Sequence, residues 1–196
     1  MMPRLSTFLL VLLTPLAAMA EPRSYNINVF HSYPNFTVNY LGLLPITGRF
    51  DKMSGKIMLD QTAKSGSVEV KIATASVTTG DAKRADGARS RDDHLRSADF
   101  FNSTEFPEMV YKSTKFNFNG EALESVEGNL TLLGVTKPVK LQASSFKCGP
   151  HPFSKKPVCG ALLETTIKRT DFGMKYAVPA IADDIKLAIG ILADQE

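Results

Sequence analysis

Apolar and polar residues alternate along most of this chain. The segment SVEVKIAT puts Val68, Val70 and Ile72 on one face and Glu69 and Lys71 on the other. Because successive side chains of a strand point to opposite faces, this period of two predicts strands with one buried face. The same pattern predicts further strands at residues 36–40, 48–60, 114–118, 130–132, 139–143, 163–167 and 185–189. We therefore expect an all-β domain of about eight antiparallel strands joined by turns such as Asn119-Gly120.

The polar faces of these strands indicate what surrounds the sheet. Charged residues stand opposite the apolar faces, at Glu69, Lys71, Lys112, Lys140, Glu164, Lys168 and Lys186. A membrane barrel would need lipid-compatible side chains there, so we expect a soluble protein with its apolar faces turned inward. A barrel and a sandwich are both compatible with the pattern, and only a closed barrel removes the exposed strand edges.

One stretch lacks the alternation. Residues 80–101 are rich in charge and predict a loop that leads into a short helix at residues 90–98. Asp92 and Asp93 near its start and Arg96 near its end suit the helix dipole. We expect this helix to lie across the barrel as a lid, with Phe100 and Phe101 leaving it toward the interior. The plain alternative is that the two rings only seal a core.

The first twenty residues have the pattern of a cleaved signal peptide. Arg4 precedes an apolar run at residues 8–13, and Ala18-Met19-Ala20 supplies the small residues of a cleavage site. The apolar run is shorter than the roughly 20 residues that a spanning helix needs. Residues 21–196 then fit one domain. The formal net charge of the whole chain, +3, does not predict nucleic-acid binding.

Export bears on the two cysteines of the chain, Cys148 and Cys159. An oxidising compartment favours a disulfide between them. A zinc site that uses both thiolates with His151 would need a fourth ligand, which the nearby sequence lacks. We therefore expect the disulfide and no metal.

Sequence motifs of the common catalytic sites are absent. The chain contains no GxSxG, HExxH or GxxxxGK motif. Asp92, Asp93 and His94 are adjacent, so their side chains leave a helix in different directions. We expect a protein that is not an enzyme, and a hydrolase that uses His94 with a carboxylate is the less favoured alternative.

Several segments together resemble the YceI-like family. They are His31-Ser32 with the following FTVNYLG, the GRF at residues 48–50, DDHLRSADFF with FPEMVYKST, GNLTLLGVTKPVKL, and RTDFGM at residues 169–174. These segments cover nearly all of residues 21–196 in the expected order. The resemblance implies an eight-stranded antiparallel, lipocalin-like barrel that holds a long polyisoprenoid or a similar lipid. It also implies a periplasmic location.

Two details refine the resemblance. The hairpin between Cys148 and Cys159 suggests a subgroup that is similar to the ubiquinone-binding members. The family usually has histidine where this chain has Tyr40. Tyrosine keeps a polar tip on an apolar ring but does not titrate near neutral pH.

The resemblance and the alternation together give a candidate site, an apolar cavity for a polyisoprenoid or ubiquinone-type lipid. Head-group contacts are expected from His94 and Arg169. The apolar cavity residues expected are Phe36, Val38, Tyr40, Phe50, Val70, Ile72, Leu95, Phe100, Phe101, Phe116, Phe118, Leu132, Leu141, Ile167, Phe172 and Leu187.

The main alternative is an interaction protein with a packed barrel. In that case the charged segment at residues 81–96 would dock an inner-membrane partner. We expect no catalytic cofactor and no nucleic-acid partner, and both a monomer and a homodimer are compatible with the sequence.

Overall fold

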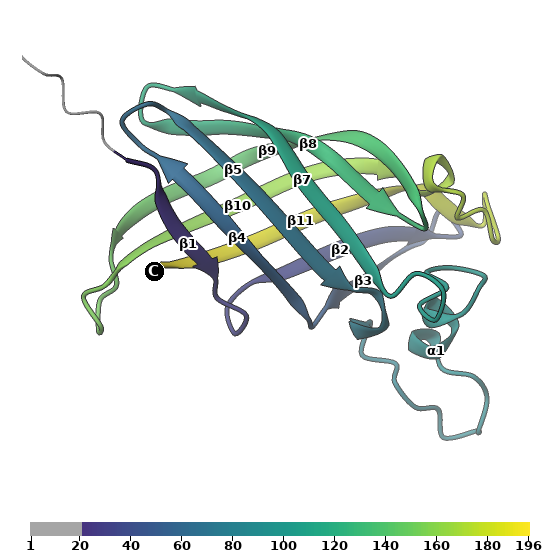
Figure 1. Cartoon of the computed structure of the whole chain (residues 1–196). Coiled ribbons are helices and arrows are strands. Elements are labelled where there is room, and N and C mark those ends of the chain that lie inside the picture. The colour runs from purple at the N-terminus through teal and green to yellow at the C-terminus, as the bar shows by residue number, and fades with distance from the viewer. Residues whose placement is uncertain (1–20) are drawn as a thin grey trace, which may run out of the picture.

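The computed structural model describes residues 21–196, which form an elongated antiparallel barrel with a short helix at one end (Figure 1). The proposed signal peptide lies outside the described residues. Eleven strands form one sheet, namely β1 (Arg23–Ile27), β2 (Tyr33–Tyr40), β3 (Leu44–Phe50), β4 (Met53–Asp60), β5 (Ser65–Ala73), β6 (Val77–Thr78), β7 (Glu108–Asn119), β8 (Ala122–Leu132), β9 (Val135–Pro150), β10 (Pro157–Lys168) and β11 (Ile181–Gln195).

The eleven strands occupy eight positions around the barrel, because three positions each hold two strands in line. β1 and β2 both pair antiparallel with β11, through Tyr25 with Gln195 and Phe36 with Leu187. β3 pairs with β2, and β4 pairs with β1. At the next position β6 pairs with β3, and β5 pairs with β4. The remaining strands pair in chain order from β7 to β11, so the sheet closes. The expected eight-stranded antiparallel barrel is confirmed.

Most strands extend beyond their predicted ranges, and some differ from the prediction in more than length. The segment at residues 48–60 is not one strand, because β3 ends at Phe50 and β4 begins at Met53. β1 was not predicted, since its five residues carry only Tyr25 and Ile27 as buried apolar positions. A strand this short gives too few repeats for the alternation to stand out.

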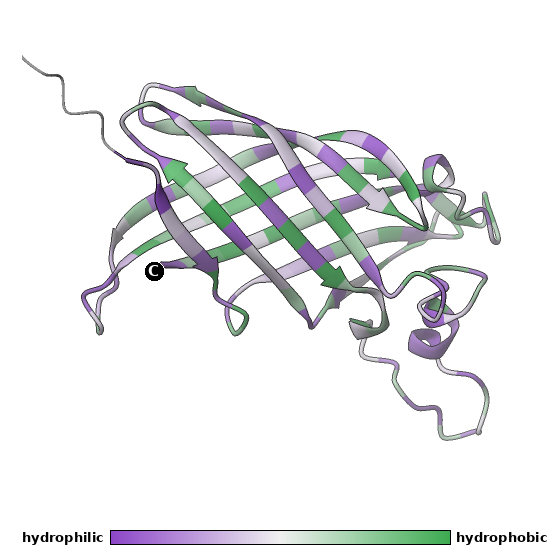
Figure 2. Cartoon of the chain, viewed as in Figure 1, coloured by the Kyte–Doolittle hydropathy of each residue, from purple (hydrophilic) through white to green (hydrophobic). Residues whose placement is uncertain are grey.

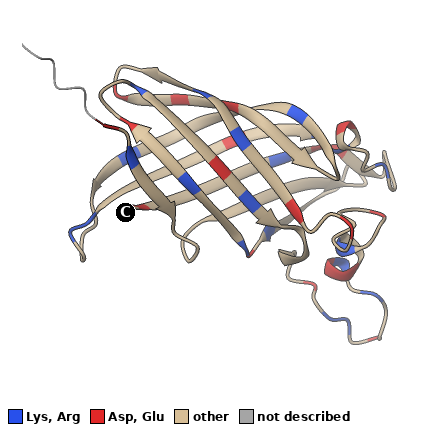
Figure 3. Ribbon diagram, viewed as in Figure 1, with Lys and Arg blue, Asp and Glu red and all other residues tan. Residues whose placement is uncertain are grey.

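The two faces of the sheet follow the alternation (Figure 2). Apolar side chains point inward and form one large buried cluster. Charged residues recur along the strands (Figure 3), and exposed ones form cross-strand ion pairs, such as Glu69 with Lys112 at 3.3 Å and Asp184 with Lys168 at 2.7 Å. Exposed pairs of this kind stabilise a fold very little, so the barrel depends on its interior.

The helix α1 (Arg91–Arg96) is shorter than the predicted range and is tied firmly to the barrel. Ser90 caps its start by accepting a hydrogen bond from the backbone N–H of Asp93. Asp92 is fully buried and accepts bonds from Thr79 N, Thr79 Oγ1 and Thr78 Oγ1 at 2.7–3.0 Å. The charge of this segment is therefore partly structural. Among residues 21–196, no helix is long and apolar enough to cross a bilayer.

The opposite end of the barrel holds a second buried cluster and is cross-linked. Tyr25, Leu59 and Ala193 are buried there in a second apolar cluster with Cys159. Cys148 and Cys159 are register partners in β9 and β10 and form a disulfide, which confirms the expected pairing. We call this the disulfide end and the other the helix end.

Candidate ligand-binding cavity

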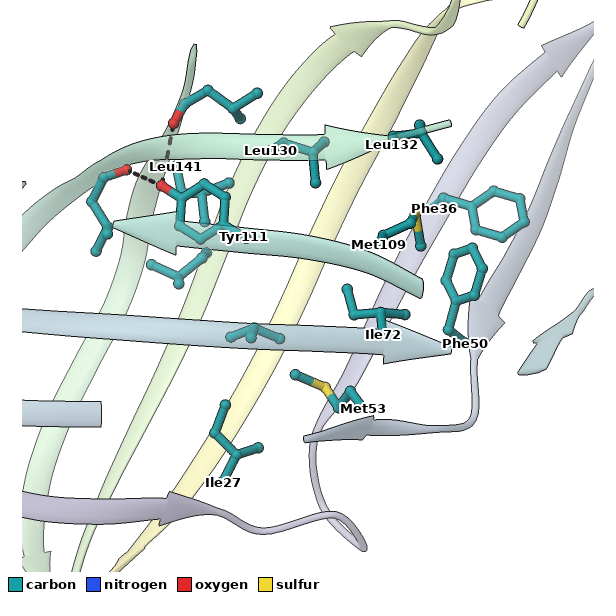
Figure 4. Close-up of a cluster of buried hydrophobic side chains, with 14 of the residues drawn as sticks. Ile27, Phe36, Phe50, Met53, Ile72, Met109, Tyr111, Leu130, Leu132 and Leu141 are labelled. Atoms are coloured by element: carbon teal, nitrogen blue, oxygen red, sulfur yellow. Dashed lines mark hydrogen bonds between the residues drawn. The ribbon is translucent and has the colours of Figure 1, made fainter. Parts of the chain in front are cut away.

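The barrel encloses a cavity of about 910 Å³. This volume lies at the upper end of the range of roughly 300–1,000 Å³ that is typical of small-molecule sites. Its wall in the middle of the barrel is apolar. The side chains of Ile27, Leu130 and Leu141 point to the barrel interior (Figure 4) and line the cavity together with Val70. The structure therefore does not show the packed barrel that the alternative hypothesis requires.

Three aromatic rings line the cavity near the helix end, and we call Phe36, Phe50 and Phe101 the aromatic neck. The Phe36 and Phe50 ring centroids lie 5.9 Å apart, and Phe101 meets Phe50 edge-on at 5.2 Å. Gly48 makes this packing possible, because a Cβ at that position would overlap the Phe36 ring. A flat, rigid ring set of this kind suits a slender apolar chain.

The lid over the opening, residues 90–101, contributes a second aromatic group. Phe100 is buried and packs edge-on against the rings of His94 and Tyr176, at 4.9 and 5.3 Å. His94 Nε2 also lies 2.8 Å from an Asp99 carboxylate oxygen. The two adjacent phenylalanines thus divide their roles: Phe100 joins the lid to Tyr176, and Phe101 joins the aromatic neck. Both line the cavity.

Tyr111 is a polar group within the wall at mid-depth. Its hydroxyl lies 3.0 Å from the carbonyl oxygen of Val126 and 3.2 Å from that of Val139, to which it donates (Figure 4). Burial, assisted by the charge of Glu127, raises the pKa of this phenol well above its usual range, so it is neutral in the folded protein. A Cβ at Gly128 would lie 2.6 Å from Tyr111 Cζ, so glycine leaves space for the ring. The sequence analysis did not identify this residue.

Arg169 is buried beside the opening, where it lines the cavity. Its guanidinium donates to the backbone carbonyls of Ala182, Met174 and Ile181 at 2.8–3.2 Å. Burial lowers the pKa of this guanidinium and the nearby Asp183 opposes the shift, yet arginine keeps its charge in proteins. Arg169 therefore ties the loop at Met174 to the first residues of β11.

Further charged residues line the opening, and the sequence analysis did not single them out as a site. Arg84 and Arg89 in the loop before α1, and Arg91 at the first position of α1, border the cavity. Each has a carboxylate partner, with Arg84 2.7 Å from Asp86 and Arg89 3.6 Å from Asp99. The polar groups of the site are thus concentrated at the helix end, whereas the deeper wall is apolar.

The structure brings most of the predicted residues to one cavity. His94, Arg169 and the following apolar residues line it: Phe36, Val38, Tyr40, Phe50, Val70, Ile72, Leu95, Phe100, Phe101, Phe116, Leu132, Leu141, Ile167 and Leu187. That these residues contact a ligand stays a prediction.

Two predicted residues do not line the cavity. Phe118 follows a register shift between Asn117 and Phe118 in β7 and packs against Phe146, with ring centroids 6.0 Å apart. Phe172 ends a 3₁₀ helix, η2 (Arg169–Phe172), and is buried in the apolar cluster of the barrel. Both residues therefore pack within the buried clusters and do not border the open space.

Comparison with known proteins places the chain among relatives of the same architecture. Residues 25–193 match the model of the YceI-like domain. Protein YceI of Shigella flexneri is 35% identical over 167 residues, which are 85% of this chain and 83% of the relative. Protein YceI of Salmonella agona is 34% identical over 191 residues, which are 97% of this chain and 95% of the relative.

Solved structures show the same fold. The YceI protein of Campylobacter jejuni is 27% identical, with a TM-score of 0.66 over 81% of this chain and 90% of that protein. BcnA of Burkholderia cenocepacia has a TM-score of 0.69 at 19% identity, over 85% of this chain and 98% of BcnA. A polyisoprenoid binding domain from Saccharophagus degradans has a TM-score of 0.64 at 17% identity, over 89% and 99%. At that identity the last two share the fold alone. With the family model spanning nearly all of the barrel and close to full-length relatives at about one third identity, the chain belongs to the YceI-like family.

Proposed function

We propose that this protein binds the tail of a long-chain isoprenoid lipid, a polyisoprenoid or a ubiquinone-type quinone, and carries it through the periplasm. The observation that carries the proposal is the apolar cavity of about 910 Å³, which extends from the aromatic neck to the buried cluster at the disulfide end. The shared fold with a polyisoprenoid binding domain is consistent with this assignment.

The energetics favour a tail over a compact ligand. Each buried methylene equivalent contributes about 0.8 kcal/mol, while association and ordering cost several kcal/mol or more. The wall offers few hydrogen-bonding groups below the neck, and the Tyr111 hydroxyl already donates to Val126 or Val139. Affinity in such a cavity grows with the buried length of the ligand.

The head group belongs at the helix end in this proposal. His94, Arg169 and Tyr40 border the cavity there, and arginine suits both a quinone oxygen and a phosphate. Tyr40 is partly exposed, so its hydroxyl can follow a head group that stays in contact with water. A tail-first entry therefore matches the distribution of polar groups.

The periplasmic part of the proposal draws on two features. The first twenty residues have the signal-peptide pattern, and the disulfide between Cys148 and Cys159 suits an oxidising compartment.

We propose no covalent chemistry. Ser90, the serine of the lid that precedes His94 by one helical turn, accepts the N-cap hydrogen bond of α1 and is not aligned as a nucleophile toward that histidine.

The proposal is tested by native mass spectrometry and organic extraction of protein purified from its own host. We expect a bound isoprenoid lipid in the wild type and its loss in the Ile72→Asp variant, because that carboxylate would enter the apolar wall. The matched control is Lys71→Asp, which changes the outward-facing neighbour on the same strand. Recovery of no lipid from the wild type, or of equal lipid from both variants, would contradict the proposal.

A further inference from the structure

The helix end carries exposed apolar side chains on two neighbouring segments. The β2–β3 hairpin exposes Leu41, Leu43 and Leu44 to 51%, 83% and 58%. The loop after η2 exposes Tyr176 and Val178 to 44% and 39%. A hydrogen bond of 2.6 Å from Leu41 N to Ala180 O holds the two segments together. We call residues 40–44 and 176–178 the apolar rim.

The rim continues the wall of the cavity. Tyr40, Leu44, Tyr176 and Ala177 belong to the rim and also line the cavity. Apolar lining side chains therefore continue from the aromatic neck through Tyr40 and Leu44 to solvent, beside the charged residues that also border the opening. Large exposed apolar patches on soluble domains mark sites of interaction.

The hairpin turn supports the same conclusion from its backbone. Leu43 N donates to Tyr40 O at 3.0 Å, and both central residues have positive φ, 57° at Leu41 and 69° at Gly42. A turn of this geometry strongly favours asparagine or aspartate before the glycine. Leu41 is unfavourable for the turn, and its apolar side chain is exposed to water. Neither feature stabilises the barrel, which points to a role outside the fold.

The charge of the rim selects among possible partners. Neither the segment at residues 39–48 nor that at residues 173–180 contains aspartate or glutamate. Lys175 is the one charged residue within these two ranges. Leucine, tyrosine and lysine are the side chains that suit the interface of a bilayer with anionic lipids. A protein seated on the rim would have to leave a path for the lipid, whereas a bilayer supplies the lipid directly.

We infer that the apolar rim inserts into the surface of an anionic phospholipid bilayer and joins the cavity to the bilayer interior. The inference rests on the proposed function, since it describes how a tail passes between membrane and barrel. The tail then slides along Leu44, Tyr40 and the neck without crossing water. Tyr176 connects this event to the lid, because its ring packs on His94 at 5.0 Å and on Phe100 at 5.3 Å.

The test is flotation of the full protein with vesicles of phosphatidylethanolamine and phosphatidylglycerol. We expect the wild type to float with the vesicles. The double variant Leu43→Ser, Leu44→Ser should bind at least about tenfold more weakly, since it removes two inserting side chains. The matched control is Phe153→Ser, which removes a side chain that is 89% exposed on the loop at the disulfide end and should bind like the wild type. All of these positions are exposed, so the variants should fold.

The outcomes separate this inference from the proposed function. Vesicle binding that is equal in the wild type and the rim variant, or that falls equally in Phe153→Ser, overturns the inference. Binding to native membranes but not to protein-free vesicles also overturns it, because it indicates a protein partner. Lipid extracted from the same samples reports on the proposed function separately. If lipid is recovered but the rim substitutions leave vesicle binding unchanged, only the docking surface is refuted.

Discussion

Three inward positions of β5 allow the depth of tail binding to be measured. Val68, Val70 and Ile72 all line the cavity, with Ile72 nearest the helix end. Successive inward residues of a strand are about 6.6 Å apart, which is about 5 Å along the axis of a barrel whose strands tilt by about 40°. A step of about 5 Å corresponds to roughly four extended carbon–carbon bonds of about 1.5 Å. Each step thus spans the backbone of about one isoprene unit.

Phenylalanine at each position should block the cavity at a different depth. Expelling one isoprene unit, about five carbon atoms, costs about 4 kcal/mol at about 0.8 kcal/mol per carbon, which is roughly a thousandfold in Kd. We expect Val68→Phe to expel the end of a long tail only. Val70→Phe and Ile72→Phe should weaken binding progressively more, because each blocks a longer part of the cavity.

The assay is a titration of polyprenols of short and long chain length, followed by native mass spectrometry. The affinity for short prenols should not change in Val68→Phe. The loss of affinity for long prenols should be smallest in Val68→Phe, larger in Val70→Phe and largest in Ile72→Phe. The control is Lys71→Phe, which adds the same ring on the outer face. Thermal unfolding of each free variant checks that overpacking, typically about 1–3 kcal/mol, has not disrupted the barrel. Equal losses at all three depths, or an equal loss in Lys71→Phe, would refute a tail that extends along β5.

Three further predictions concern stability. Replacing Cys148 and Cys159 with serine should lower the free energy of unfolding by about 3 kcal/mol, as expected for a closed loop of this size, and a denaturant melt that shows no loss would contradict this. Asp92→Ala should speed amide hydrogen exchange in the lid, since the carboxylate receives bonds from Thr78 and Thr79; exchange at the wild-type rate would show that the lid is held by other contacts. Burial acts against the ionised form of Asp183, but the bonds from Thr170 and the charges of Lys168 and Arg169 together outweigh it and hold the pKa of Asp183 below its ordinary value. Its contribution to stability is therefore present above about pH 4 and lost as the pH falls through the lower folded pKa, so thermal unfolding should show the difference between the wild type and Asp183→Asn shrinking below about pH 4, and a constant difference would exclude this role.

The barrel could be predicted from the sequence because a regular strand shows its inward face at every second residue. The prediction fails locally where the backbone is irregular. In β7, Met109 and Tyr111 point inward, but a register shift between Ser113 and Lys115 changes the parity, so that Phe116 is the next inward ring. Phe118 follows a second shift, and it packs against the buried clusters instead of lining the cavity. A β-bulge leaves no clear mark in a single sequence.

The site was predictable where it follows the strands and less so where it depends on tertiary contacts. Inward residues such as Phe36, Val70 and Leu141 follow from the alternation. Tyr111 was missed because its role depends on Gly128, which lies on the adjacent strand and leaves room for its ring. The part of Arg169 in supporting the loop before β11 could not be foreseen either, since its partners are backbone carbonyls.

Tyr25, Leu59 and Ala193 line the cavity at the disulfide end and are buried, whereas Tyr40 and Leu44 line it at the helix end and are exposed, so we expect a single opening at the helix end. A carrier with a single doorway cannot accept cargo on one side while discharging it on the other. The membrane that donates the lipid and the membrane that accepts it must both use the same opening, so the protein has to dissociate from the first before it binds the second. The proposed function therefore implies a protein that shuttles lipid by successive encounters with two membranes and does not span the space between them.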